Sequence, residues 1–180
     1  LEGAVGMTSG LIYAPGLYST AEELCELSKG LADFNGLYES HMRSESDNMV
    51  ASVCDTIEVG QKAGIPVQIS HHKASGRQNW GKVRESLSIV EAARAEGVDV
   101  TVNVYPYEAC STTLRAILPG WVQEGGFGKL KERLGDASIR ERLKEEILRE
   151  GDGWDNYYLL GGRAEGVILL FFPVTPQYEG

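Results

Sequence analysis

The first 107 residues repeat a unit of about 30 residues in which a helix, a glycine and a β-branched strand follow one another. Gly64 and Gly97 occupy the same place in successive units, because each ends an apolar-striped helix and precedes a strand. Strands that alternate with helices of this length form parallel sheets with right-handed crossovers. The sequence therefore predicts an α/β fold, either a barrel or an open doubly wound sheet. The expected strands are 5–9, 36–41, 65–70 and 98–104, and the expected helices between the last three are 49–63 and 81–96.

Polar residues mark where several helices should begin. Thr20 has the form of an N-cap for the first helix, and Asp47 is expected to cap the helix that follows the second strand. After Ser111 the repeat fails, and residues 129–150 form a charged, helical run whose second half Asp136 can cap. We interpret this run as a helical insertion with an exposed charged face, followed by a further strand at 157–160 or 166–172.

Composition and charge exclude several classes of protein. Hydrophobic residues make up 42% of the chain and charged residues 24%, values typical of a globular domain. The net charge of −9 disfavours binding to nucleic acid or to anionic lipid. The apolar runs are far shorter than the roughly 20 residues that cross a bilayer. We therefore expect a cytoplasmic protein that binds neither nucleic acid nor membrane.

The three cysteines are expected to be free thiols, because they are scattered and odd in number. Cys25 and Cys54 fall within predicted helices and are expected to pack as small hydrophobic residues. Cys110 falls in a loop and is expected to be exposed.

Two histidines occupy equivalent places in the repeat. His41 and His71 each follow a serine at the end of successive predicted strands, 30 residues apart. In a parallel α/β barrel such positions lie side by side at the carboxyl-end rim, where active sites form. Two neutral imidazoles there are suited to share Zn²⁺, although hydrogen-bonded structural histidines are the open alternative. His72 should point elsewhere by strand alternation, toward solvent or behind a metal ligand.

Other rim residues suggest substrate contacts. Lys73 lies two residues after His71 and is suited to hold an anionic substrate group, unless it is an ordinary surface lysine. Tyr105 ends the next strand and has either a hydrogen-bonding or a packing role. We expect the charged segment of Arg43, Glu45 and Asp47 to be a solvated rim or a helix cap.

Several motifs together resemble one family, the N-acyl-D-amino-acid deacylases (D-aminoacylases) of the amidohydrolase superfamily. The resemblance covers essentially the whole chain, including the stretch from Leu118 to Gly180. The earlier motifs are GLIYAPG from Gly10, SHMR from Ser40, ISHHK from Ile69 and YPY from Tyr105.

The resemblance implies a metal-dependent (β/α)₈ (TIM-type) barrel that hydrolyses the amide bond of small N-acyl-D-amino acids, with one or two Zn²⁺ ions. His41 and His71 match metal-binding histidines of the family, and Lys73 and Tyr105 match positions that hold the substrate α-carboxylate. On this basis residues 1–107 would be central βα units of the barrel, 108–155 a helical insertion, and 156–180 an incomplete return toward the barrel.

The sequence departs from the family pattern in what it lacks. The His-x-His pair of the first strand, the ligand cysteine and the late-strand catalytic aspartate have no counterpart, so no catalytic residue is identified. We therefore expect an internal fragment, inactive alone, whose open strand edges favour a homo-oligomer or aggregation. Two alternatives stay open: a hydantoinase-like or dihydroorotase-like cyclic amidase, and a non-catalytic remnant.

Overall fold

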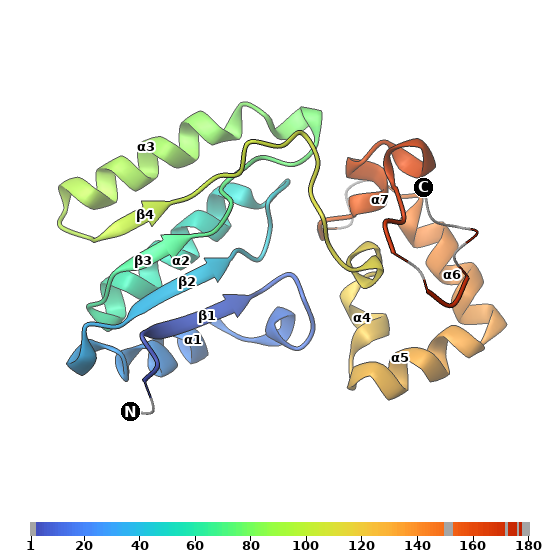
Figure 1. Cartoon of the computed structure of the whole chain (residues 1–180), viewed down its shortest axis with the longest axis horizontal. Coiled ribbons are helices and arrows are strands. Elements are labelled where there is room, and N and C mark those ends of the chain that lie inside the picture. Colours follow the sequence, from blue (N-terminus) through green and yellow to red (C-terminus); the bar gives the residue numbers. More distant parts are fainter. Residues whose placement is uncertain (1–2, 150–152, 172, 176, 178–180) are drawn as a thin grey trace.

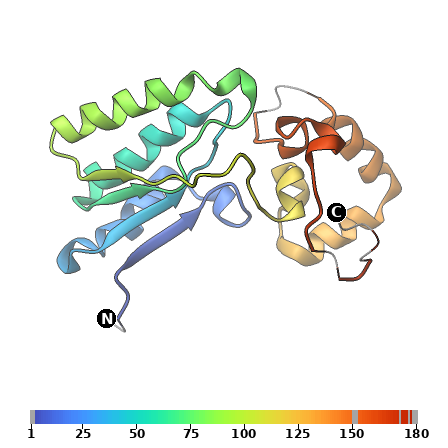
Figure 2. The ribbon, with the colours of Figure 1, turned by 45° about the horizontal axis from the view of Figure 1, so that its top comes forward.

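The computed structural model describes residues 3–149, 153–171, 173–175 and 177, which form a sheet lobe, from β1 to β4, and a helical lobe, from η4 to η5 (Figures 1 and 2). The strands are β1 (Gly6–Gly10), β2 (Leu37–His41), β3 (Val67–Ile69) and β4 (Val100–Val102). The helices of the sheet lobe are α1 (Ala21–Lys29), α2 (Met49–Ala63) and α3 (Lys82–Ala95), with the 3₁₀ turns η1 (Gly16–Tyr18), η2 (Ala32–Phe34) and η3 (Arg77–Asn79). The helical lobe contains η4 (Leu114–Ile117), α4 (Gly120–Gln123), α5 (Gly126–Gly135), α6 (Ala137–Ile147), α7 (Tyr157–Leu160) and η5 (Arg163–Gly166).

The four strands are parallel and lie in chain order, β1-β2-β3-β4. Tyr38 of β2 pairs in register with Val67 of β3, which pairs with Val100 of β4. A doubly wound sheet reverses its strand order at a switch point, whereas successive strands of a (β/α)₈ barrel lie side by side. The observed order confirms the α/β prediction and favours part of a barrel over an open doubly wound sheet.

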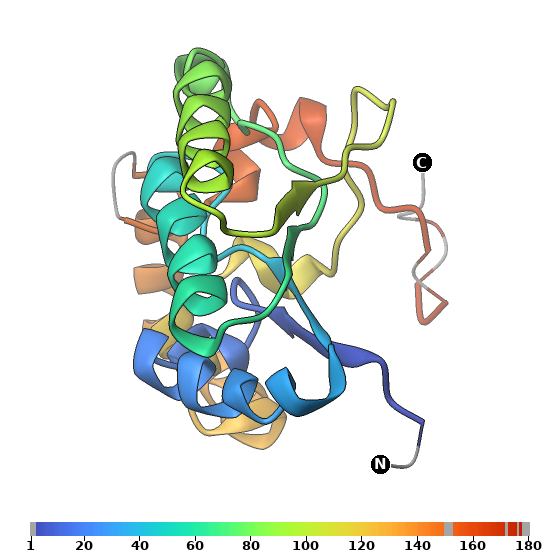
Figure 3. The same cartoon turned by 90° about the vertical axis from the view of Figure 1, so that its left-hand side faces the viewer.

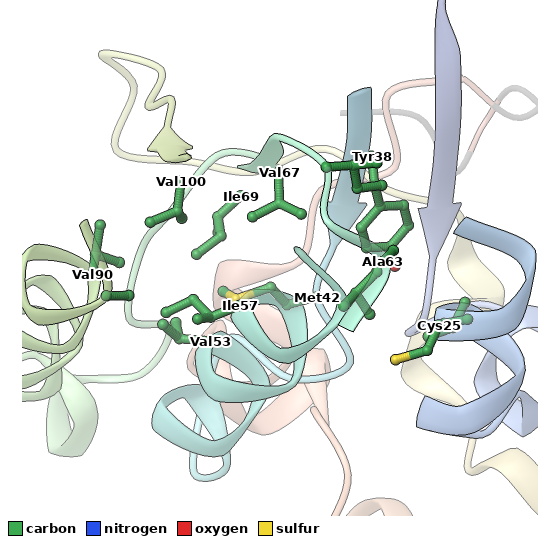
Figure 4. Close-up of a cluster of buried hydrophobic side chains, with 14 of the residues drawn as sticks. Cys25, Tyr38, Met42, Val53, Ile57, Ala63, Val67, Ile69, Val90 and Val100 are labelled. Atoms are coloured by element: carbon green, nitrogen blue, oxygen red, sulfur yellow. The ribbon is translucent and has the colours of Figure 1, made fainter. Parts of the chain in front are cut away.

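The helices α1, α2 and α3 cover one face of the sheet (Figure 3). The core lies between these helices and the sheet. There Tyr38, Val67, Ile69 and Val100 of the strands contact side chains such as Val53 of α2 (Figure 4). All five are buried. Full burial of a Val or Ile side chain contributes about 1.5–3 kcal/mol, so this face carries much of the stability of the lobe.

The opposite face of the sheet carries polar side chains. Strand alternation places Glu39, Gln68, Thr101 and Asn103 there, and hydrogen bonds join them across three strands. This polar face leads at its carboxyl end to the two histidines.

The predicted helix ends are largely confirmed. Thr20 Oγ1 accepts the N–H of Glu23 at 3.1 Å, and Asp136 accepts from the N–H groups of Ser138 and Ile139. Gly64 ends α2 in the left-handed conformation, with φ of 67°, which explains why the repeat needs glycine there.

The structure corrects three predictions. Asp47 does not cap α2: the N-cap is Asn48, and the Asp47 carboxylate instead accepts a hydrogen bond from Asn79 Nδ2 at 2.9 Å. The further strand is absent from the described residues, because Asn156 caps the helical turn α7 at 157–160 and residues 167–171 lie in the helical lobe, away from the sheet. Residue 172 lies outside the described part of the chain.

The third corrected prediction is that both Cys25 and Cys54 pack as small hydrophobic residues, which holds for Cys25 alone. All three are free, as predicted, and Cys110 is exposed. Cys25 is buried against the core, but Cys54 is exposed on α2, because its place in the helix turns it away from the apolar stripe.

The helical lobe has a small core of its own, built on Val122, Leu130 and Leu143. The charged run divides into α5 and α6 at Asp136, with its polar side chains largely exposed as predicted. None of the described helices is long and apolar enough to cross a membrane.

The left-handed end of α2 gives a test of the fold. We expect Gly64→Ala to lower the free energy of unfolding by about 1–2 kcal/mol, because a Cβ disfavours this backbone conformation. Gly128→Ala is the matched control. Gly128 lies within α5, with open space around its Cα and no positive φ, so alanine should stabilise the chain by up to about 1 kcal/mol. Chemical denaturation of both variants measures the difference, and equal effects would contradict the assignment of Gly64 as a required glycine.

Candidate metal centre

The two rim histidines lie side by side, as the repeat predicts. His41 is the last residue of β2 and His71 follows β3, so the parallel pairing of these strands brings both to one edge of the sheet. Their ring centroids are 4.4 Å apart and the ring planes meet at 73°. Tyr13 packs on the other side of His41, with ring centroids 5.0 Å apart.

A buried carboxylate completes the cluster. The Glu45 side chain is only 1% exposed, and its Oε1 lies 2.6 Å from His71 Nδ1. One potential ligand atom from each of His41, Glu45 and His71 falls within 4.8 Å of the others. The prediction that Glu45 belongs to a solvated rim is therefore wrong, because the loop after β2 turns this side chain inward.

The donor set fits a cation. His41 Nε2 and Glu45 Oε1 are both buried without a hydrogen-bond partner, which is costly unless another group satisfies them. Glu45 Oε1 nevertheless has the His71 ring nitrogen Nδ1 at 2.6 Å, whereas His41 Nε2 is the atom of the cluster that stays without a partner. Two imidazoles and one carboxylate are ligand types that Zn²⁺ accepts.

Electrostatics favour the ligating forms of these groups. Burial lowers the pKa of His41 to about 4, against the attraction of Glu45, so its imidazole is neutral at physiological pH. Burial alone would raise the pKa of Glu45, but the nearby His71 and Lys73 outweigh it and hold the pKa below its usual range. The cluster thus presents neutral nitrogen and anionic oxygen, as divalent metals require.

Both predicted substrate residues stand beside this cluster. Lys73 Nζ lies 2.6 Å from Glu45 Oε2 and 3.1 Å from His71 Nδ1, and it sits 5.2 Å from the centre of the Tyr105 ring. The Lys73 side chain is 23% exposed, and its Nζ also donates to the backbone O of His71 at 3.1 Å. Burial raises the pKa of Tyr105 to about 12, which keeps its hydroxyl protonated and able to donate.

His72 points away from the cluster. It is buried, and its Nε2 lies 2.9 Å from Ser86 Oγ on α3. Strand alternation predicts this divergence from His71, but the solvent-facing alternative is wrong because α3 covers that side.

The helical lobe fixes the loop that carries Glu45. Asp155 accepts hydrogen bonds from Ser44 Oγ at 2.6 Å, from Glu45 N at 2.6 Å and from Ser46 Oγ. Tyr157 OH donates to Glu45 Oε2 at 3.3 Å, and burial raises the Tyr157 pKa well above its usual value. Two segments more than 100 residues apart thus meet at the metal-ligand candidate.

A weak sequence signal for Glu45 exists. It follows His41 by four residues in a loop rich in serine, Ser40 to Ser46, whose hydroxyls can solvate a buried acid. The sequence alone does not show which acidic residue of this loop is buried, because Asp155, which anchors the loop, lies 110 residues further along the chain.

The chain is similar to enzymes of one kind over most of its length, although no model of a known protein family matches it. It is 42% identical to a D-aminoacylase of Alcaligenes xylosoxydans xylosoxydans over 114 residues, 63% of this chain and 23% of that protein. An N-acyl-D-glutamate deacylase of the same organism is 41% identical over 112 residues, 62% of this chain and 23% of its own length. The chain thus spans about a quarter of the length of these curated relatives.

Solved structures of enzymes of this kind are also similar to the chain. A D-aminoacylase crystal structure, described as defining a novel subset of amidohydrolases, matches with a TM-score of 0.61 and 32% identity over 79% of this chain and 33% of that one. An N-acyl-D-glutamate deacylase of Bordetella bronchiseptica, complexed with zinc and a phosphonate mimic of the tetrahedral intermediate, matches with a TM-score of 0.57 and 40% identity over 58% of this chain and 22% of that one. The resemblance predicted from the sequence motifs is confirmed.

The Asp155 anchor can be tested by stability. We expect Asp155→Asn to lower the free energy of unfolding by about 1.5–3 kcal/mol, because an amide cannot accept all three of these buried hydrogen bonds. Asp33→Asn changes an exposed acid and should have little effect. Chemical denaturation compares the two, and an unchanged midpoint for Asp155→Asn would show that the loop does not depend on the anchor.

Proposed function

We propose that this chain, a relative of the D-aminoacylases in both sequence and fold, provides the metal-binding histidines of a metal-dependent N-acyl-D-amino-acid deacylase. The observation that carries the proposal is the His41–Glu45–His71 cluster, with the unpartnered buried nitrogen of His41, at the carboxyl edge of parallel strands. Active sites of (β/α)₈ enzymes form at this edge.

The metal would be zinc, one or two ions, held by His41 and His71 with the Glu45 carboxylate beside them. When bound, zinc polarises an amide carbonyl and supplies an activated water near neutral pH. The chain's own groups prepare the site: burial keeps His41 neutral, and Lys73 keeps Glu45 ionised.

Lys73 and Tyr105 would receive the substrate α-carboxylate. Lys73 Nζ pairs with Glu45 Oε2 and lies 3.1 Å from both Nδ1 and the backbone O of His71, so a substrate carboxylate would take the place of one of the two His71 contacts. The Tyr105 hydroxyl, protonated throughout the physiological range, donates beside it. A carboxylate fixed at this point determines which enantiomer directs its amide toward the histidines.

The proposal also assigns the parts of the chain to parts of a barrel enzyme. In this proposal residues 1–107 form central βα units of a barrel, and residues 108–155 a helical insertion at the mouth of the site. Support comes from the strand order and from the anchor that Asp155 provides for the Glu45 loop.

An open-chain substrate is favoured over a hydantoin, because a hydantoin has no free carboxylate for Lys73 to bind. Dihydroorotate is a cyclic amide that does carry a carboxylate, so only its rate of ring opening distinguishes it. A panel of N-acetyl-D-amino acids, their L-enantiomers, hydantoins and dihydroorotate, tested on the full-length enzyme that contains this chain, separates the two. Ring opening faster than deacylation would favour the cyclic amidase.

Metal binding by the chain itself gives the first test. We expect equilibrium dialysis to detect Zn²⁺, and His41→Ala or His71→Ala to reduce its affinity by at least tenfold. His72→Ala is the matched control, because this histidine contacts α3 rather than the cluster. Its loss should reduce stability and leave zinc affinity unchanged. A chain that binds no zinc, or loses it equally with all three variants, would contradict the proposed site.

The substrate role of Lys73 gives a second test. In the full-length enzyme, Lys73→Met should raise KM for N-acetyl-D-amino acids about 10- to 100-fold, which corresponds to the loss of a charged hydrogen bond. An N-acetyl amine that lacks the carboxylate should lose much less, and only through the loss of the Lys73–Glu45 pair, which both substrates share. Lys62→Met, which removes an exposed lysine paired with Glu58 on α2, should alter neither. Equal loss toward both substrates would contradict carboxylate binding by Lys73.

A further inference from the structure

The backbone of His71 is held in an unfavourable conformation. Its φ is 38°, in the left-handed region that residues other than glycine rarely adopt. Among the described residues other than glycine only Asn35 and Arg163 share this feature; Asn35 follows η2 in a turn and Arg163 begins η5. Such a backbone conformation is unfavourable and persists only where its surroundings impose it.

One residue of the neighbouring strand imposes it. Asn103, just beyond β4, binds the segment from Ile69 to His72 with three groups. Its N–H donates to Ile69 O at 3.1 Å, its side-chain Oδ1 accepts the N–H of His71 at 2.5 Å, and its backbone O accepts the N–H of His72 at 2.8 Å. The two successive histidine N–H groups are thus both taken up by Asn103.

The Asn103 amide is itself oriented. Its Nδ2 donates to Glu39 Oε1 at 3.4 Å, and the same oxygen accepts Ser70 Oγ at 2.5 Å and Gln68 Nε2 at 3.0 Å. An ionised carboxylate only accepts hydrogen bonds. A flipped amide would therefore set Oδ1 against Glu39 and Nδ2 against the His71 N–H, two repulsive contacts.

We infer that Asn103, oriented by Glu39, is a positioning residue that sets the place of the His71 imidazole opposite His41 and Glu45. This inference rests on the proposed metal-binding role of His71. Rotation about φ would swing the ring away from His41, whose centroid lies 4.4 Å away, and from Glu45 Oε1 at 2.6 Å. Groups that orient metal ligands in this way typically change metal affinity 10- to 100-fold when removed.

The test is a Co²⁺ titration of the full chain, followed by visible absorption, which reports ligand geometry as well as affinity. Asn103→Ala should weaken Co²⁺ binding about 10- to 100-fold and change the spectrum. Gln68→Ala is the matched control, since Gln68 also donates to Glu39 from the same face of the sheet but does not contact His71. It should leave both readouts unchanged. Equal losses in the two variants would overturn the inference, because they would indicate general damage to the sheet.

A paired exchange provides the rescue. In Glu39→Gln/Asn103→Asp the donor and acceptor change places between the two positions, while an oxygen still faces the His71 N–H. The Gln68 amide and the Ser70 hydroxyl, which donate to Glu39 Oε1 in the wild-type chain, turn an acceptor toward the new N–H donor. This double variant should regain most of the affinity that Asn103→Ala loses, and it replaces that variant if Asn103→Ala does not fold. A double variant as weak as Asn103→Ala would count against positioning by this pair.

Amide hydrogen exchange of the metal-free chain tests positioning by Asn103 independently of metal binding. If the wild-type chain binds no Co²⁺, the proposed metal site fails, and Asn103 is judged by exchange at the His71 N–H alone. Exchange at least tenfold faster in Asn103→Ala than in Gln68→Ala would support positioning. Equal exchange in both variants would overturn it.

Discussion

The buried carboxylate of Glu45 is the charge on which the arrangement of the site depends. A carboxylate that is 1% exposed is strongly destabilising unless cations or hydrogen-bond donors surround it. Here the groups come from two places in the chain, His71 and Lys73 after β3 and Tyr157 from α7, while Asp155 holds the backbone of the loop that carries Glu45. Removing any one of these leaves charge that the others must balance, so the sheet lobe and the helical lobe are coupled at this point.

Two kinds of structural constraint form the site, the pairing of strands and the contacts of individual side chains. Parallel pairing of β2 and β3 brings His41 and His71 together, and this constraint is regular, since it follows from strand register alone. The orientation of each side chain is irregular. It depends on a left-handed residue at His71, on the Asn103 amide and on a carboxylate anchor 110 residues away from the loop it holds. Regular pairing places the two histidines side by side, and irregular contacts orient their rings and the Glu45 carboxylate toward one another.

The difference between regular strand pairing and individual long-range contacts explains which features the sequence could predict. The helix–glycine–strand repeat predicts the parallel sheet, the ends of α2 and α3, and the pairing of His41 with His71, because each depends on local patterns repeated along the chain. Glu45 was expected at a solvated rim, and Asp47 at a helix cap. Both depend on contacts with Asp155 or Asn79, which lie far away in sequence. The apolar run after Val167 reads as a strand by composition, yet a strand also needs a neighbour to pair with.

The contacts of Lys73 would also govern how the proposed site treats an anionic substrate. Lys73 Nζ has three partners, Glu45 Oε2 at 2.6 Å and the Nδ1 and backbone O of His71 at 3.1 Å. The ammonium and the Glu45 carboxylate are together neutral, so a substrate carboxylate would replace a His71 contact rather than join a free face of the ammonium. In the proposed function Glu45 would therefore favour an anionic substrate only indirectly, by holding the Lys73 ammonium beside the histidines.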